Sequence, residues 1–346
     1  MITFNQIKKL PKIELHRHLD GAVQPKLIFD LAQKNKIDLP VSNLKELKKY
    51  YQITKQTSAA EFVQKFDLVI SLMQTPENLQ TIAYEQVLNL KKENILYAEL
   101  RFAPHYHDQK GLTYIQVIKN VLLGFRKGYQ KTGVLTNLII CLVREAKPEL
   151  GEKVVKAALE FKNDQGPVRV VAIDLACDEA NYPPERHLSA YKLTFNSYLK
   201  RTAHAGEFGQ QRLKNIKTVI NVLRADRLGH AIPLVTDQEL MDLVKKKNIG
   251  IEFNPLSNLI CHNIETINDL QIDKYFHQGI RFSINSDDPA MMFTSLSDNL
   301  DQVCQAYSWG LKELKIITLN TIDISFASTL EKKNLKQTFL KKWPRN

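Results

Sequence analysis

The stretch IELHRHLDG at residues 13–21 combines an apolar beginning with two closely spaced histidines. Its apolar beginning predicts a β-strand, in which residues two apart face the same side. One face therefore carries four polar side chains: Glu14, His16, His18 and Asp20. Two imidazoles near the end of a strand are well placed to share a metal ion. By itself an H-x-H pattern is weak, so its meaning depends on what accompanies it.

Similar β-rich runs recur along the whole chain, and longer helical patterns separate them. The eight runs are Ile13–His18, Leu96–Ala103, Leu135–Val143, Val170–Cys177, Arg201–Glu207, Arg227–Ala231, Gly250–Asn254 and Arg281–Asn285. Strands that alternate with helices over this length predict a parallel α/β sheet. Eight repeats favour closure into a (β/α)8 TIM barrel over an open, doubly wound sheet. We expect one domain spanning residues 1–346.

The connection after the first run is far longer than the others. Within residues 19–95 lies an amphipathic helical pattern whose apolar face carries Phe62, Val63, Phe66, Val69, Ile70 and Met73. Long insertions after barrel strands commonly cover an active site. The sequence therefore predicts a helical lid in residues 19–95, although ordinary packing of this helix against the barrel would explain the same pattern.

Composition and charge narrow the class of protein. Of 346 residues, 44% are hydrophobic and 25% are charged, the balance of an ordinary globular protein. Nothing resembles a membrane-spanning segment or a signal peptide, so a cytoplasmic location is expected. The net charge of +11 permits nucleic-acid binding, but the lysines are scattered, so we expect neither a nucleic-acid nor a membrane partner. The oligomeric state cannot be read from the sequence.

Cysteine spacing argues against a thiolate metal site. The four cysteines, Cys141, Cys177, Cys261 and Cys304, lie far apart, and none belongs to a C-x-x-C pair. They are expected to be reduced thiols in or near the core.

Three later strand ends also deliver polar residues suited to catalysis. His204 and Glu207 follow the fifth run, His230 ends the sixth, and Asp287 with Asp288 follows the eighth. Each has a simpler explanation alone; Asp-Asp-Pro, for example, suits a turn or a helix N-cap. Together with the first strand they place histidine or aspartate at four carboxyl ends, the face where barrel enzymes build their active sites.

This set of residues predicts metal-assisted hydrolysis. Three imidazoles and one carboxylate, from His16, His18, His204 and Asp287, suit a divalent transition metal, zinc first. Water on such a metal has a pKa of about 7, which supplies hydroxide at neutral pH. Glu207 could then shuttle protons, and His230 could hold the hydroxide. The residues alone leave the bond open, since the carbon attacked could bear an amine, an ester or a phosphate.

Several motifs resemble those of the adenosine deaminase family. They are PKIELHRHLDGA from residue 11, HAGE from residue 204, LGH at residues 228–230 and SDDP at residues 286–289. YAELRFAPH from residue 97 and AIDLACDE from residue 172 are similar to its second and fourth strands, and EFVQKFD from residue 61 to its lid helix. The resemblance extends from about residue 7 to about residue 330.

The resemblance implies a reaction and a role for each residue. One zinc ion per chain would be held by the four predicted ligands, with adenosine and 2′-deoxyadenosine as substrates. Glu207 would protonate N1 of the purine, and His230 would orient the hydroxide that attacks C6, so that inosine and ammonia form. Asp288 would bind N7, while Asp20 and His18 would lie near the sugar. An apolar wall over the nucleoside would come from Phe62 and Phe66.

Two positions depart from the family pattern. Cys177 and Ala231 stand where the family usually has glycine. The backbone N–H at position 177 would approach the purine, and a thiol there would alter the pocket, so substrate range is in question. Adenine and N6-modified AMP deaminases share the same metal set and remain alternatives. A barrel without catalysis is a further one, although the complete set of ligands argues against it.

Overall fold

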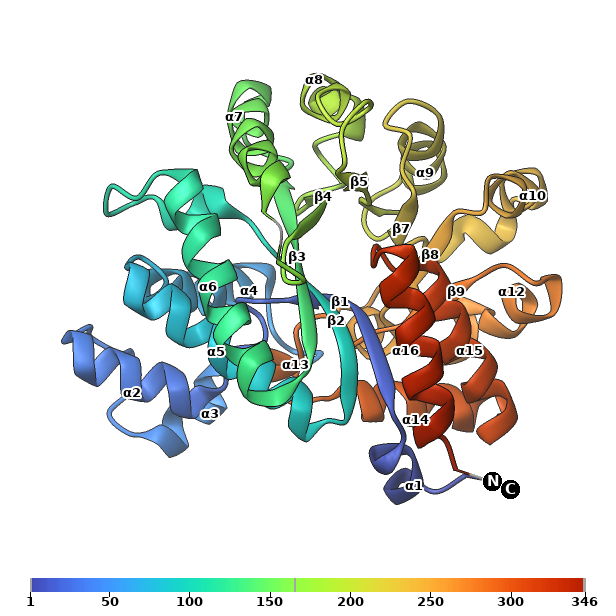
Figure 1. The fold of residues 1–346 in the computed structure, drawn as a ribbon, viewed down its shortest axis with the longest axis horizontal. Helices are drawn as coiled ribbons and strands as arrows, with labels where there is room; N and C mark the ends of the chain where they lie inside the picture. Colours follow the sequence, from blue (N-terminus) through green and yellow to red (C-terminus); the bar gives the residue numbers. More distant parts are fainter. Residues whose placement is uncertain (1, 165, 345–346) are drawn as a thin grey trace.

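Parallel strands follow one another in chain order around a central ring (Figure 1). The computed structural model describes residues 2–164 and 166–344. Within these residues the strands are β1 (Lys12–His18), β2 (Ile95–Phe102), β3 (Leu135–Val143), β4 (Val170–Ala176), β5 (Lys200–Arg201), β6 (His204–Ala205), β7 (Arg227–His230), β8 (Gly250–Phe253) and β9 (Phe282–Ile284). The fold is that of a TIM barrel, as the sequence predicted.

The fifth predicted strand is divided into two short pieces, β5 and β6. The first piece pairs with β4 and the second with β7, so the strands form a five-stranded and a four-stranded sheet. Thr202 N–H still donates to Ile173 O (2.9 Å) and Gly229 N–H to Ala203 O (2.8 Å). The strand thus changes partner halfway along, as the stagger between barrel strands requires.

The first and last strands meet at the metal-site end of the ring. His18 N–H donates to Asp287 O (2.9 Å), and Asp287 N–H donates to His16 O (3.1 Å). Arg17 and Asp287 form an isolated parallel bridge between the two sheets. These backbone bonds place the HRH stretch directly beside the segment that follows β9.

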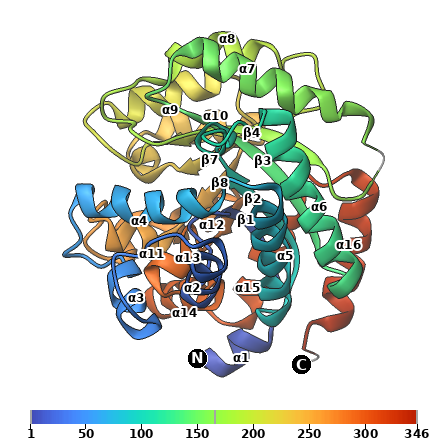
Figure 2. The same ribbon diagram turned by 90° about the vertical axis from the view of Figure 1, so that its left-hand side faces the viewer.

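Helices surround the strands on the outside (Figure 2). Their bounds are α1 (Phe4–Lys9), α2 (Pro25–Asn35), α3 (Leu44–Tyr51), α4 (Ala59–Leu72), α5 (Pro76–Lys92), α6 (Tyr114–Thr132), α7 (Pro148–Leu159), α8 (Leu188–Lys192), α9 (Arg212–Asn221), α10 (Gln238–Lys247), α11 (Pro255–Ile260), α12 (Ile272–Gln278), α13 (Pro289–Met292), α14 (Leu296–Tyr307), α15 (Leu311–Ile324) and α16 (Thr329–Lys342). None of the helices in the described ranges has the length and hydropathy needed to cross a membrane.

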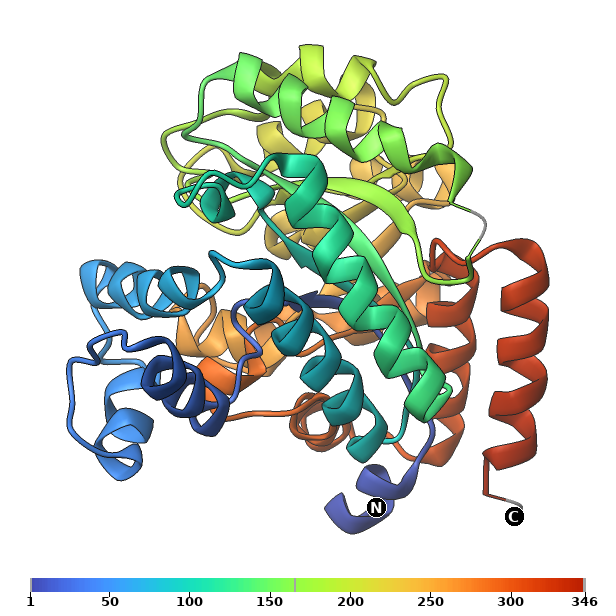
Figure 3. The ribbon, with the colours of Figure 1, turned by 60° about the vertical axis from the view of Figure 1, so that its left-hand side comes forward.

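The long insertion after β1 consists of α2, α3, α4 and α5. Figure 3 shows α2, α3 and α4 projecting on the side of the strands opposite to α15 and α16. Tyr51 O–H donates to Asp20 O (3.4 Å), and Ile53 N–H donates to Met291 O (2.7 Å). The insertion therefore contacts the loops that follow β1 and β9, where the predicted site lies. Whether it opens and closes as a lid stays a prediction.

Charged side chains fill part of the barrel interior. The guanidinium of Arg227, fully buried, lies 2.6 Å from both Glu99 Oε2 and Glu252 Oε1. Its Cζ atom lies 3.6 Å from the centroid of the Phe326 ring. A buried carboxylate is tolerated only when it is paired, so the two glutamates depend on this arginine.

Replacing Arg227 with Met should therefore lower the free energy of unfolding by about 3–5 kcal/mol, because two buried carboxylates lose a partner. Denaturant unfolding followed by circular dichroism measures the change. Arg186→Met is the matched control, since Arg186 is exposed and stacks on Tyr182, and it should cost less than about 1 kcal/mol. Equal losses in the two variants would contradict the importance of the interior pairs.

Candidate metal centre and active site

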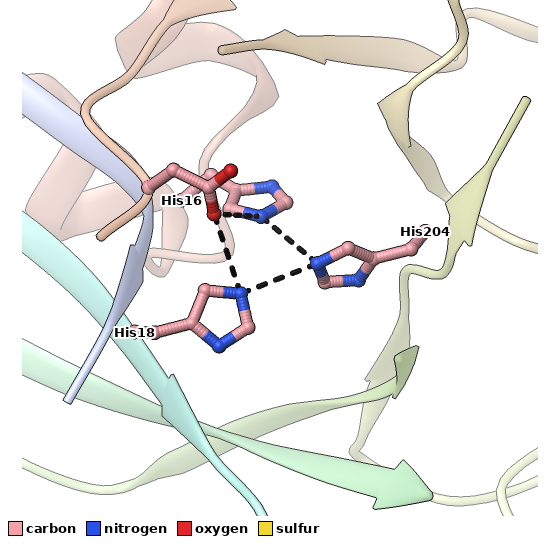
Figure 4. Close-up of side chains that lie close together, drawn as sticks. His16, His18 and His204 are labelled. Atoms are coloured by element: carbon pink, nitrogen blue, oxygen red, sulfur yellow. Dashed lines mark hydrogen bonds and ion pairs between the residues drawn. The ribbon is translucent and has the colours of Figure 1, made fainter. Parts of the chain in front are cut away.

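Four predicted ligands converge at the carboxyl end of the ring. His16 and His18 lie on β1, His204 begins β6, and Asp287 follows β9. The Nε2 atom of His204 lies 3.1 Å from that of His16 and 3.2 Å from that of His18. Asp287 Oδ1 lies 3.2 Å from His16 Nε2 and 3.4 Å from His18 Nε2. Figure 4 shows the three rings and the carboxylate turned toward one another.

The protonation of the rings explains why this geometry suits a cation. His16 Nδ1 donates to Glu252 Oε2 (2.7 Å), and His204 Nδ1 lies 3.1 Å from Asp174 Oδ2. Those bonds place the hydrogens on Nδ1 and leave the Nε2 lone pairs facing each other. Four tetrahedral ligands at about 2.0–2.1 Å from zinc are separated by roughly 3.3–3.4 Å, close to the spacing found here. His16, His18, His204 and Asp287 thus form a metal site.

Two further predicted catalytic residues border this site. Glu207 lies in the turn after β6, and His230 ends β7 with its Nε2 3.5 Å from Glu207 Oε2. Burial, followed by the charge of Asp287, raises the pKa of Glu207 well above its usual range. Burial lowers the pKa of His230 to about 3. Burial therefore favours the protonated form of the carboxyl group, and the imidazole stays neutral at neutral pH.

Asp287 and Asp288 are adjacent in the chain and have opposite protonation behaviour. Burial opposes the ionisation of Asp287, but the histidines around it, His16 first, hold its pKa well below the usual range. Burial and the charge of Asp287 raise the pKa of Asp288 well above it. Asp288 Oδ1 is buried and has no hydrogen-bond partner among the described residues. Its Oδ1 atom is therefore available to bond a ligand.

Gly21 and Asp20 lie close to the carboxyl group of Asp288. A Cβ atom at position 21 would be 1.7 Å from Asp288 Oδ1, so only glycine allows that carboxyl group its position. Burial raises the pKa of Asp20 to about 6, which leaves its carboxyl group mostly ionised at neutral pH. The loop after β1 thus places the carboxyl group of Asp20 near that of Asp288.

The two departures from the family pattern share an unusual backbone conformation. Cys177 has φ +80° and Ala231 has φ +48°, in the left-handed region that favours glycine. The Cys177 thiol is exposed and lies 3.7 Å from the hydroxyl of Tyr106.

Phe62 and Phe66 are half-buried on α4 and stack on each other, with ring centroids 5.2 Å apart. Both rings pack against the hydrophobic core. The packing explanation of this helix therefore has direct support, whereas contact with a bound purine stays a prediction.

The residues that orient the histidines of the site were not predicted from the sequence. Glu252 and Asp174 hold the Nδ1 atoms of His16 and His204, and Asn258 Oδ1 accepts from His230 Nδ1 (2.8 Å). Glu252 and Asp174 lie inside apolar strands, and a charged residue in a strand buried on both faces could have signalled a site. Asn258 lies on α11 and gave no such signal.

Comparison with known proteins agrees with this geometry. The family model described as Adenosine deaminase matches residues 11–342. An adenosine deaminase of Clostridium acetobutylicum is 34% identical over 331 residues, 95% of this chain and 97% of that protein. The adenine deaminase of Arthrobacter aurescens superposes with a TM-score of 0.86 at 25% identity, covering 96% and 98% of the two chains. The N6-methyl-AMP deaminase of Arabidopsis thaliana shares the fold, with a TM-score of 0.85 at 24% identity over 98% of each chain.

A TIM barrel with three histidines and one aspartate at its carboxyl end defines a metal-dependent hydrolase of the amidohydrolase fold. Within that class, the chain belongs to the adenosine deaminase family.

The strain at Cys177 can be measured. Cys177→Gly should leave the free energy of unfolding unchanged or raise it by up to about 1 kcal/mol, because glycine adopts φ +80° without a steric cost. Cys177→Val should lower it by more than about 1 kcal/mol, since a β-branched residue resists this conformation. Urea denaturation of both variants provides the test, and a Gly variant less stable than the Val variant would contradict it.

Metal affinity should depend on Asp174 through His204. Asp174→Asn is expected to weaken zinc binding about 10–100-fold, because the amide holds the imidazole less firmly than the carboxylate does. Competition with a chelator of known affinity measures this. Asp178→Asn is the control, since Asp178 contacts Asn181 in the next loop, and it should bind zinc like the unaltered protein. Unchanged affinity in Asp174→Asn would show that the contact does not support the metal.

Proposed function

We propose that this protein hydrolyses adenosine, and also 2′-deoxyadenosine, to inosine or deoxyinosine and ammonia, with one zinc ion per chain. The observation that carries the proposal is the convergence of three histidines and Asp287, with the buried carboxyl groups of Glu207 and Asp288, whose pKa values are raised, beside them. The reaction needs an acid at a ring nitrogen and a hydroxide at the adjacent carbon, and this combination suits both.

Glu207 is proposed as the acid. Its raised pKa keeps a proton available at neutral pH, and donation of this proton to N1 draws electrons from C6. Water then adds its oxygen to C6, and the bond from C6 to the amino nitrogen breaks. The departing nitrogen takes up protons and leaves as ammonia. Zinc, when bound, lowers the pKa of water so that hydroxide is available near pH 7.

His230 is proposed to position the attacking water. Its Nδ1–H donates to Asn258 Oδ1 (2.8 Å), so Nε2 carries the lone pair. Nε2 lies 3.5 Å from Glu207 Oε2 and 3.8 Å from Asp287 Oδ2, between the acid and the metal site. Nε2 also accepts from Asn254 Nδ2 (3.1 Å), so a hydrogen bond from water would share or replace that contact. A neutral imidazole there does not repel the cation.

Recognition of the purine is assigned to the remaining predicted residues. Asp288 is proposed to donate its proton to N7, consistent with its raised pKa and its Oδ1 atom that has no partner among the described residues. Asp20 and His18 are proposed to lie near the ribose, and the N–H of Cys177 near the base. Phe62 and Phe66 are proposed to cover the nucleoside.

The carboxyl groups in the site favour a neutral nucleoside over a nucleotide. Asp20 is mostly ionised at neutral pH and would repel a phosphate near the sugar. A curated relative at 34% identity over nearly the whole chain is named adenosine deaminase. Adenine is the second candidate, because the adenine deaminase of Arthrobacter aurescens shares the fold at 25% identity. Cytoplasmic purine salvage would be the corresponding role.

Release of ammonia from adenosine, adenine and AMP, and of methylamine from N6-methyl-AMP, assayed in parallel with zinc-loaded protein, tests the substrate. Adenosine should react with a kcat/KM at least about 100-fold above the others, because the sugar contacts are lost with adenine and the phosphate is repelled in the nucleotides. Preference for adenine or a nucleotide would overturn the assignment of adenosine and leave the metal site unaffected.

Two substitutions separate the acid from the metal ligands. Glu207→Gln should keep zinc bound and lower kcat at least about 1,000-fold, because an amide cannot supply the proton. His204→Ala should lose most of the zinc and with it the activity, since a ligand is removed. Zinc content by atomic absorption, measured beside ammonia release, distinguishes the two. Near-full activity of Glu207→Gln would show that another group is the acid.

A further inference from the structure

Glu179 is a buried acid outside the residues assigned above. It lies in the loop after β4, and only 2% of its surface is exposed. A carboxylate this deeply buried is costly unless donors surround it, so its partners show what it does.

Those partners are the backbone of the turn that carries Glu207. Glu179 Oε1 accepts from Gly206 N–H (2.7 Å) and from Asn215 Nδ2 (3.1 Å). Its Oε2 accepts from Glu207 N–H (2.8 Å) and from Phe208 N–H (3.0 Å). Three consecutive N–H groups therefore point at one carboxylate, an arrangement that the backbone adopts around an anion.

The conformation of the turn depends on that anion. Gly206 has φ +80°, and a Cβ atom there would lie 2.6 Å from Ile216 Cδ1, so the turn is tightly packed on the side of α9. On the other side, among the described residues, the oxygens of Glu179 accept the N–H groups of residues 206–208. Without them, two buried donors, at residues 206 and 207, would be left unsatisfied at about 1–3 kcal/mol each, and the part-buried N–H of Phe208 would also lose its partner.

We propose that Glu179 is a positioning residue: its carboxylate fixes the backbone of residues 206–208 and thereby aims the Glu207 side chain at the purine ring. This inference rests on the proposed function, in which Glu207 is the acid. A proton donor must lie within hydrogen-bond reach of its acceptor, and a displacement of about 1 Å can lower the rate about 100-fold.

Glu179→Gln is the main test because it keeps the shape and removes half of the acceptor capacity. One side-chain oxygen remains, and the new NH2 group faces backbone donors. The kcat for adenosine should fall about 100-fold while KM changes less than about threefold, and zinc content should be unchanged. Hydrogen exchange of a peptide spanning residues 203–209, followed by mass spectrometry, should become at least about tenfold faster.

Glu313→Gln is the matched control. Glu313 is half-buried and accepts from the backbone N–H of Gly310 (2.9 Å), so it too holds a backbone N–H group, but at the start of α15, which carries no predicted site residue. Its kcat and the exchange of residues 203–209 should match those of the unaltered protein.

A double variant tests whether Glu179 acts through Glu207. In a Glu207→Gln background, adding Glu179→Gln should slow the residual reaction less than about threefold, because the aimed group is already gone. A further 100-fold loss would overturn the proposal, and so would a single Glu179→Gln variant with normal kcat.

Asn215 offers a second, milder way to weaken the contacts of Glu179. If Glu179→Gln does not fold, Asn215→Ala removes one of the four hydrogen bonds, and it should give a smaller fall in kcat with faster exchange at residues 203–209. Unchanged exchange in that variant would overturn the proposal. If the unaltered protein releases no ammonia from any purine, the proposed function fails. Unchanged hydrogen exchange at residues 203–209 in Glu179→Gln would, independently, overturn the proposal that Glu179 fixes the backbone of residues 206–208.

Discussion

The carboxylate of Glu252 connects the structure of the barrel to its chemistry. It accepts hydrogen bonds from His16 Nδ1 (2.7 Å), Arg101 Nη2 (2.7 Å), Arg227 Nε (2.6 Å) and Thr202 Oγ1 (3.0 Å). Burial opposes its ionisation, but the two arginines beside it outweigh burial and hold its pKa well below the usual range. Glu252, which lies on β8, therefore contacts side chains of β1, β2 and β7 and of the segment between β5 and β6.

That central charge has consequences for the metal site. Glu252 and Asp174 fix the hydrogens on Nδ1 of His16 and His204. The Nε2 atoms of both rings therefore present their lone pairs to the same point. Arg101 bonds both acids, so the orientation of the two rings is set by one network. Because these interior charges depend on one another, the stability of the barrel is sensitive to the loss of any one of them.

Strained backbone is concentrated at the same end of the ring. Cys177, His230, Ala231 and Asp287 all have positive φ, and all lie where a strand ends. Such conformations cost free energy and persist where the surrounding structure fixes them, as it does at binding sites. The sharp turns direct consecutive side chains to different surroundings. Asp287 contacts the histidines, which lower its pKa, whereas the pKa of the neighbouring Asp288 is raised.

Much of this protein could be predicted from its sequence. The alternation of β-rich and helical runs indicated the barrel, because the two periods of two and 3.6 residues are local properties of the chain. The HRH stretch and the histidine and aspartate residues at three later strand ends indicated the metal site, because parallel strands bring their carboxyl ends to one face. The sequence did not reveal the change of partner between β5 and β6, which depends on the stagger between neighbouring strands. Nor could it show that Glu252, Asp174 and Asn258 orient the histidines, that Glu179 holds the turn of Glu207, or which carboxyl groups have a raised pKa. Those properties depend on distances between residues far apart in the chain and on burial, and only the tertiary structure determines either.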